Sequence, residues 1–326
     1  MIINPFTLNY LVLSFFSLTV LFICAALVFI WRKILSGYQK AVFFHQAEQK
    51  LYLLITLFMT LFLLRLFLIP FWFVLLHSLI PSIPGAMCLT GVHIAGAPYS
   101  YWSSAAKIVM PLVYGFWLYI NHYDRKISGQ RLLKWKLNLL PPLLAVMLAE
   151  IITDLRFLFT LKPRVVNCCT SVFDLPVGWP GKISTQHYLP LPWGVLSAAS
   201  IFFVLLLLLI LCKHKNRLLL WGIAAAAVSS LISLVFFLQV DGCRLAMGTM
   251  YHHCLFCLLE SRAPVSASFV LIMTGLFIAL IHAVLGFILI KEKLADVFAS
   301  HFNSWLMKAI LLLCAGGVLL LRQIIR

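Results

Sequence analysis

The chain has 326 residues, of which 63% are hydrophobic and only 10% are charged, and its mean hydropathy is +1.05. A soluble domain of this length cannot bury so much apolar surface, so the composition predicts a polytopic integral membrane protein. The net charge of +16 does not indicate a nucleic acid partner. The basic residues flank apolar runs, where they set the topology and contact anionic lipid head groups of the bilayer.

Eight apolar runs follow one another along the chain, and most of them are long enough to cross a hydrocarbon core of about 30 Å. They predict an all-α helical bundle of about eight transmembrane helices with no β domain. We expect one transmembrane domain over the whole chain, and no internal repeat is visible in the sequence. The predicted spans are residues 9–31, 51–79, 105–120, 137–161, 193–212, 218–238, 265–290 and 309–321.

Lys and Arg concentrate in the connectors that follow the first, third, fifth and seventh predicted spans. The positive-inside rule assigns these connectors to the cytoplasm. Both termini then face outward, and we expect a multi-pass protein of the bacterial inner membrane. The loops that face outward with the termini are residues 80–104, 162–192 and 239–264.

Residues 241–260, DGCRLAMGTMYHHCLFCLLE, concentrate side chains that bind soft metals. The predicted topology adds cysteines from the other two outward loops. Because these loops share one side of the membrane, their side chains can form one cluster. The predicted members of this Cys/His/Met cluster are Cys88, Cys168, Cys169, Cys243, Met247, Met250, His252, His253, Cys254 and Cys257.

The first hypothesis for this cluster is a soft-metal site. Thiolate and thioether ligands select Cu(I), with imidazole as a borderline partner. His253, Cys254 and Cys257 place three ligands within five residues, and a helix starting there puts both sulfurs on one face. Zinc accepts the same Cys and His ligands. The sequence therefore predicts binding or transfer of a metal ion, copper first, at the outer membrane surface.

Two further hypotheses stay open. The first is thiol–disulfide exchange, an enzymatic activity in which Cys254 and Cys257 react and a second thiol pair relays electrons. That pair is Cys168 with Cys169, or Cys88 with Cys243. This logic resembles that of the envelope thiol oxidases, which pass electrons to quinone and resemble four-helix bundles, whereas this chain has about twice as many predicted spans. The second is a scaffold whose outer loops are tied by disulfides and dock an envelope protein partner.

Ionisable residues also occur inside predicted spans. Arg65 lies near the middle of the second span, and Glu150 and Asp154 lie four residues apart on the fourth span, hence on one helix face. A lone ion at this depth is strongly unfavourable. The sequence therefore predicts an intramembrane ion pair between Arg65 and one of the two carboxylates, which serves as a clamp between helices or as part of an ion path.

Overall fold

The structure is a computed structural model that describes residues 4–37, 44–125, 132–166, 192–213, 217–238, 242, 254–291 and 295–325. The described residues are mainly helical, and none of them lies in a β-strand. The chain divides into two compact units, Met1–Val166 and Asn167–Arg326.

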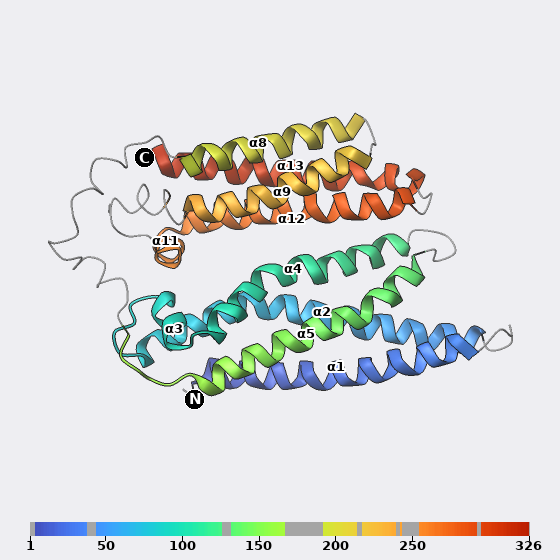
Figure 1. The fold of residues 1–326 in the computed structure, drawn as a ribbon, viewed down its shortest axis with the longest axis horizontal. Coiled ribbons are helices and arrows are strands. Elements are labelled where there is room, and N and C mark those ends of the chain that lie inside the picture. Colours follow the sequence, from blue (N-terminus) through green and yellow to red (C-terminus); the bar gives the residue numbers. More distant parts are fainter. Residues whose placement is uncertain are drawn as a thin grey trace. The chain divides into compact units, whose positions relative to one another are not determined.

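Unit 1 contains four long helices that pack in a closed order. In this order α1 contacts α2 and α5, and α4 contacts the same two helices (Figure 1). The connection between α2 and α4 holds a short 3-10 helix, Ile80–Ser82, and the seven-residue helix α3, Leu89–Ala95. The long helices are α1 (Pro5–Gly37), α2 (Phe44–Leu79), α4 (Tyr99–Asp124) and α5 (Leu133–Thr160).

Aromatic side chains fill much of the interior of unit 1. Phe62 is fully buried and stacks on Tyr114 with ring centroids 5.1 Å apart, and it also meets the ring of Trp117 edge-on at 5.1 Å. Trp72 is also fully buried and meets the ring of Phe157. These contacts join α2, α4 and α5 into one core.

The start of α1, the end of α2 and the end of α5 meet at one end of unit 1. The side chain of Asn4 donates a hydrogen bond to Ser78 at 3.0 Å, and the backbone N–H of Val166 donates to the carbonyl of Pro84 at 3.0 Å. Gly85 has a φ of +83°, and a Cβ there would lie 2.2 Å from the Val166 oxygen. Glycine is therefore required for this close approach.

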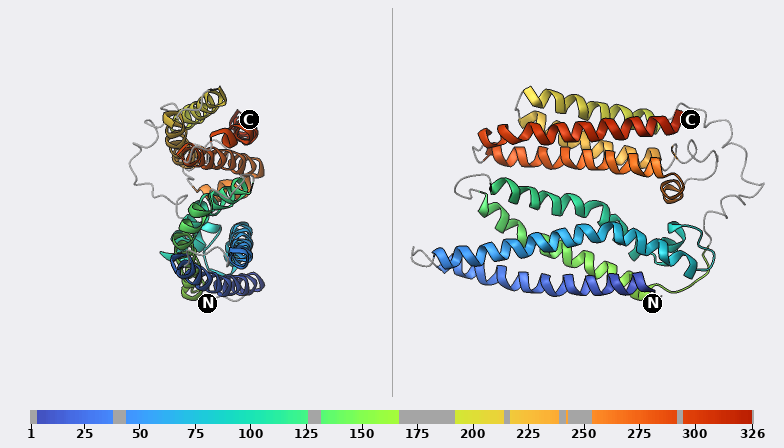
Figure 2. Two further views of the ribbon diagram at one scale, coloured as in Figure 1. Left: turned by 90° about the vertical axis from the view of Figure 1, so that its right-hand side faces the viewer. Right: turned by 180° about the vertical axis from the view of Figure 1, so that it is seen from behind.

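Unit 2 repeats this arrangement with different residues. Its long helices close in the order α8, α9, α12 and α13, and α11 packs on α12 (Figure 2). The bounds are α8 (Pro192–Lys213), α9 (Arg217–Phe237), α11 (Leu255–Ser261), α12 (Ala263–Lys291) and α13 (Ala295–Ile325). Within the described residues, each unit shows two long helices, a seven-residue helix and two further long helices, an order that the sequence did not reveal.

The long helices of the described chain follow the predicted spans in order, and six of them are long and apolar enough to cross a membrane. These six lie in α1, α2, α4, α9, α12 and α13. Among the described residues of α8, the apolar stretch Leu196–Leu208 is shorter than these six. Large apolar side chains such as Phe29, Phe67 and Phe202 are at least two-thirds exposed on the surfaces of their units. Such surfaces indicate contact with a lipid bilayer.

Several helices extend beyond their predicted spans, among them α4 and α13. Helix α4 begins at Tyr99, whereas the predicted span begins at residue 105. Helix α13 is continuous from Ala295 to Ile325, and its apolar stretch, Ser304–Gln323, is longer than the predicted residues 309–321. In both cases the first turns contain polar side chains, so the apolar run in the sequence begins later than the helix does.

Candidate cysteine site and buried charge cluster

Cys254 and Cys257 lie together at the start of α11 in unit 2. Cys254 has an extended backbone and caps the helix, and its sulfur accepts a hydrogen bond from the backbone N–H of Cys257 at 3.5 Å. The two sulfurs lie within 4.8 Å of each other, and both side chains are half-buried. The Cys-x-x-Cys spacing thus brings both sulfurs to one face of the short helix, in line with helical periodicity.

The other predicted soft ligands are distributed differently. Cys88 is described, and it lies in unit 1 as the N-cap of α3. All the remaining members of the cluster fall outside the described residues, so their participation stays a prediction. These members are Cys168, Cys169, Cys243, Met247, Met250, His252 and His253.

Helix α3 holds Cys88 and His93 in the interior of unit 1. Cys88 is 2% exposed and His93 is 1% exposed. The hydroxyl of Ser100 donates to the backbone carbonyl of His93 at 2.7 Å, and the guanidinium of Arg164 donates to the carbonyl of Ile94. Burial lowers the pKa of His93 to about 4, although the nearby Cys88 opposes this shift. His93 is therefore a neutral imidazole at neutral pH.

Arg65, Glu150 and Asp154 meet inside unit 1 together with Lys107. Nη2 of Arg65 lies 2.8 Å from Oε1 of Glu150 and 3.2 Å from Oδ2 of Asp154. Nζ of Lys107 lies 2.6 Å from Oδ2 of Asp154 and also contacts Oε1 of Glu150. These four residues, hereafter the charge cluster, are at most 3% exposed. Arg65 thus pairs with both carboxylates, and the two cations balance the two anions.

Neutral hydroxyl groups complete the surroundings of the carboxylates. Tyr10 of α1 donates to Oδ2 of Asp154 at 2.6 Å, Ser103 donates to Oδ1 of Asp154, and Tyr114 donates to Oε2 of Glu150. Every carboxylate oxygen of the charge cluster therefore accepts at least one hydrogen bond. These contacts link all four long helices of unit 1.

Sequence reasoning missed Lys107, Tyr10, Ser103 and Tyr114. Lys107 lies only two residues inside the predicted span 105–120, so the sequence alone did not indicate that it is buried. The earlier start of α4 places Lys107 well inside the helix, where it is buried. A signal was present, since polar residues recur on one face of α4 at helical spacing. These residues are Ser100, Ser103, Ser104, Lys107 and Tyr114.

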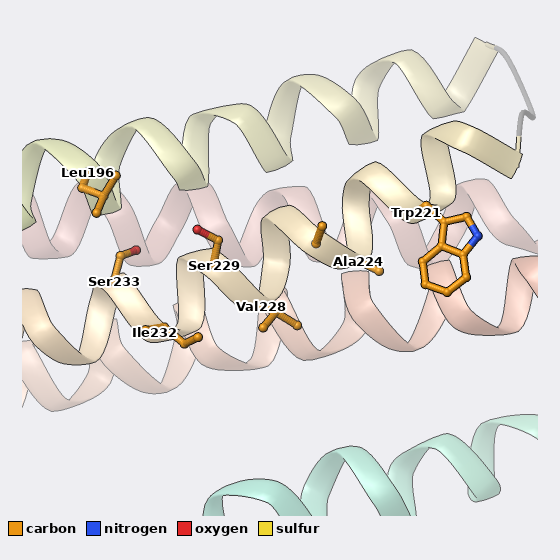
Figure 3. Close-up of a pocket in the computed structure, with 8 residues that line it drawn as sticks. Leu196, Trp221, Ala224, Val228, Ser229, Ile232 and Ser233 are labelled. Atoms are coloured by element: carbon orange, nitrogen blue, oxygen red, sulfur yellow. The ribbon is translucent and has the colours of Figure 1, made fainter.

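Unit 2 also has a pocket of about 610 Å³ (Figure 3). It is lined by Leu196 of α8 and by one face of α9 from Trp221 to Ser233. The lining is apolar apart from Ser229 and Ser233, and it contains no cysteine. This pocket is separate from the cysteine pair of α11.

The chain matches no protein-family profile, no curated protein and no solved structure. The geometry and chemistry of its side chains are therefore the basis for assigning a function.

Proposed function

We propose that this chain is a multi-pass membrane protein that binds or transfers a soft metal ion, copper first, through Cys254 and Cys257. The observation that carries the proposal is the separation of the two sulfurs, which is within 4.8 Å. A metal–sulfur bond is about 2.3 Å long in zinc sites, so one ion can bind both sulfurs. Two thiolates are also the ligand type that selects Cu(I).

Further ligands come from the residues that precede α11. His253 is adjacent to Cys254 in the sequence, and His252, Met250 and Met247 lie within the seven residues before it. Imidazole and thioether groups complete a Cu(I) site of low coordination number, whereas zinc requires four ligands. The contributions of Cys88, Cys168, Cys169 and Cys243 stay predictions from the sequence.

The test is a competition titration of the purified full-length chain, kept reduced, with Cu(I) and a chromogenic Cu(I) chelator. We expect the double variant Cys254→Ser/Cys257→Ser to weaken Cu(I) binding about a hundredfold or more, because it removes both thiolates. Cys314→Ser is the matched control, since Cys314 lies on α13 and is exposed. Equal affinities of the wild type and the double variant would contradict the proposal. The same titration with Zn(II) identifies the preferred ion.

Thiol–disulfide exchange is a second candidate, and one observation favours it. The N–H of Cys257 points to the sulfur of Cys254, and such a hydrogen bond stabilises the thiolate that attacks a disulfide. In this reaction the two thiols lose two protons and two electrons and form one disulfide, and the electrons reduce a quinone to a quinol. Each unit also has four long helices, so the number of predicted spans no longer separates this chain from four-helix thiol oxidases.

The same preparation separates the two candidates. Under the metal proposal, a lipid-soluble quinone added to the reduced protein is not consumed, and both thiols remain reactive toward an alkylating reagent. Under the redox candidate, one quinone is reduced for each pair of thiols lost, and Cys254→Ser abolishes the reaction. Quinone reduction without Cu(I) binding would replace the metal proposal by the redox one.

A further inference from the structure

Two exposed arginines of unit 1 are held against the turn that joins α3 to α4. The guanidinium of Arg164 donates to the backbone carbonyl of Ile94, near the end of α3. Nη1 of Arg156 donates to the hydroxyl of Tyr99 at 3.3 Å, and its Cζ lies 5.9 Å from the centre of the same ring. Tyr99 is the first residue of α4, and only four residues separate it from Ile94. Both guanidinium groups are therefore fixed at one short turn.

This turn packs closely on the end of α5, which carries the two arginines. Gly96 is buried in the turn, and a Cβ there would lie 2.2 Å from Cε2 of Phe157. Phe157 directly follows Arg156, and Arg164 lies four residues beyond Thr160, where α5 ends (Figure 1). The surface that presents the arginines is therefore packed in advance, so a ligand that binds there orders little of the chain.

The described acidic side chains of unit 1 do not compensate these charges. Asp124, Glu150 and Asp154 are buried, and each pairs with a cation of the interior. Lys162 lies between the two arginines in the sequence, and it is also exposed. The end of α5 thus carries a positive surface without a counter-ion among the described residues of unit 1, and such a surface attracts an anion.

Exposed aromatic side chains lie on the same two helix ends. Tyr101 and Trp102 in the first turn of α4 are 50% and 68% exposed, and Phe159 in the last turn of α5 is 53% exposed. Helix α4 is a candidate membrane span, Tyr99–Asp124, so its first turn lies at the boundary between hydrocarbon and water. Aromatic rings and long cationic side chains are typical of this boundary, where they meet lipid head groups.

Charge and exposed aromatic area together define the partner. An acidic protein segment would compensate the charge but would leave the rings in water, whereas a phospholipid brings its phosphate to the cations and its acyl chains to the rings. The planar guanidinium fork matches a phosphate, and each arginine uses only one of its five N–H donors on the turn. We propose that Arg156 and Arg164 bind the phosphate group of an anionic phospholipid in the leaflet that meets this end of unit 1. This site is independent of the cysteine pair and of the direction in which the chain is inserted.

Native mass spectrometry of the full-length protein, released from a neutral detergent, tests the proposal. Palmitoyl-oleoyl phosphatidylglycerol and the phosphatidylcholine with the same acyl chains are titrated separately, and the lipid adducts are counted. We expect the wild type to bind phosphatidylglycerol about tenfold more tightly, because the choline group cancels the charge of the phosphate. Equal affinities for the two lipids would overturn the proposal.

A pair of double variants locates the site. Arg156→Gln/Arg164→Gln should weaken phosphatidylglycerol binding about tenfold and leave phosphatidylcholine binding unchanged. Arg262→Gln/Arg322→Gln is the matched control, because it removes the same charge at two exposed positions of unit 2, and it should bind both lipids like the wild type. The same affinity for phosphatidylglycerol in the two folded double variants would contradict the assignment to Arg156 and Arg164.

Two further measurements cover the remaining outcomes. If the glutamine variant fails to fold, Arg156→Lys/Arg164→Lys replaces it, since this variant keeps the charges but loses both planar forks and should weaken phosphatidylglycerol binding about threefold. A polyglutamate peptide should not displace phosphatidylglycerol from the wild type. Displacement of the lipid by this peptide would assign the surface to an acidic protein partner and overturn the lipid proposal.

Discussion

At the residue scale, the buried charges of unit 1 form a four-membered network and not a single ion pair. Lys107 and Arg65 each contact Glu150 and Asp154, and all four side chains are excluded from solvent. Removing one partner from a buried pair leaves an uncompensated charge, and this penalty exceeds the loss of the attraction itself. The energetic effect of a substitution therefore depends on the net charge that remains.

Lys107→Met provides a test of this dependence. The variant leaves two carboxylates facing one cation, and we expect it to lower the free energy of unfolding by about 3–5 kcal/mol. The double variant Lys107→Met/Glu150→Gln restores neutrality and should lose less than the sum of the two single changes. Reversible unfolding in mixed micelles measures the four stabilities. Strict additivity would contradict a coupled network, and Arg156→Met, at an exposed position, should change stability by only about 0.5 kcal/mol.

The sequence predicted part of this network for a simple reason. Arg65, Glu150 and Asp154 interrupt long apolar runs, so their burial and mutual attraction could be expected. Lys107 is preceded by serines, and these made the start of α4 resemble a loop. The structure shows that Ser103 donates to Asp154, that Ser100 donates to the carbonyl of His93, and that Ser104 lies 3.3 Å from the indole nitrogen of Trp72. Their polarity belongs to the interior of unit 1, a role that composition alone does not distinguish from solvent exposure.

At the element scale, the long helices were predictable and the short ones were not. Apolar runs of about 20 residues identify the long helices by length alone. Helices α3 and α11 have seven residues each and no apolar period that a sequence can display. The cysteines that cap them, Cys88 and Cys254, were recognised only as possible ligands. Their shared position, between the second and third long helices of each unit, required coordinates.

Close packing between α12 and α13 depends on glycine. A Cβ at Gly316 would lie 2.6 Å from Cγ1 of Ile272 and 3.0 Å from the carbonyl oxygen of Ser268, and one at Gly275 would lie 2.8 Å from Cγ of Leu313. Small residues at such crossings allow helix backbones to approach within a membrane. The neighbouring Gly317 has no such contact within 4 Å.

We therefore expect opposite effects of alanine at adjacent positions. Gly316→Ala should destabilise the protein by about 1–3 kcal/mol, because the added methyl group must displace α12. Gly317→Ala should be neutral or stabilising by up to about 1 kcal/mol, since alanine favours the helix over glycine. Thermal unfolding in detergent, followed by circular dichroism, compares the two variants. Equal melting temperatures would show that the α12–α13 contact tolerates a larger residue.

At the scale of the whole molecule, the structure has two units with the same element order. An even number of long helices in each unit returns the chain to the side on which the unit began, provided that all of them cross. Among the described residues, three helices of each unit are long and apolar enough to cross a membrane. The topology in which both termini and the loops at residues 80–104, 162–192 and 239–264 share one side therefore stays a prediction. The distribution of Lys and Arg predicts that this side is the exterior.

Reporter fusions to the full-length protein in a bacterial host test this topology. Alkaline phosphatase, which is active only outside the cytoplasm, should be active when inserted within residues 167–191 or fused after residue 326. Green fluorescent protein should fluoresce when inserted within residues 126–131, since the positive-inside rule assigns this connector to the cytoplasm. A fluorescent fusion at the C-terminus would place that terminus in the cytoplasm and contradict the predicted topology.

The charge cluster has a consequence for how unit 1 is made. A ribosome synthesises the helices in order, so Arg65 and Lys107 enter the translocon before either carboxylate exists. Arg65 precedes Asp154 by 89 residues and Lys107 precedes it by 47 residues. Helices α2 and α4 therefore carry unneutralised cations until α5 has been synthesised. Helix α5 carries both anions of the charge cluster, Glu150 and Asp154. We therefore expect α1, α2 and α4 to insert stably only after α5 has been synthesised. Insertion of unit 1 is then cooperative.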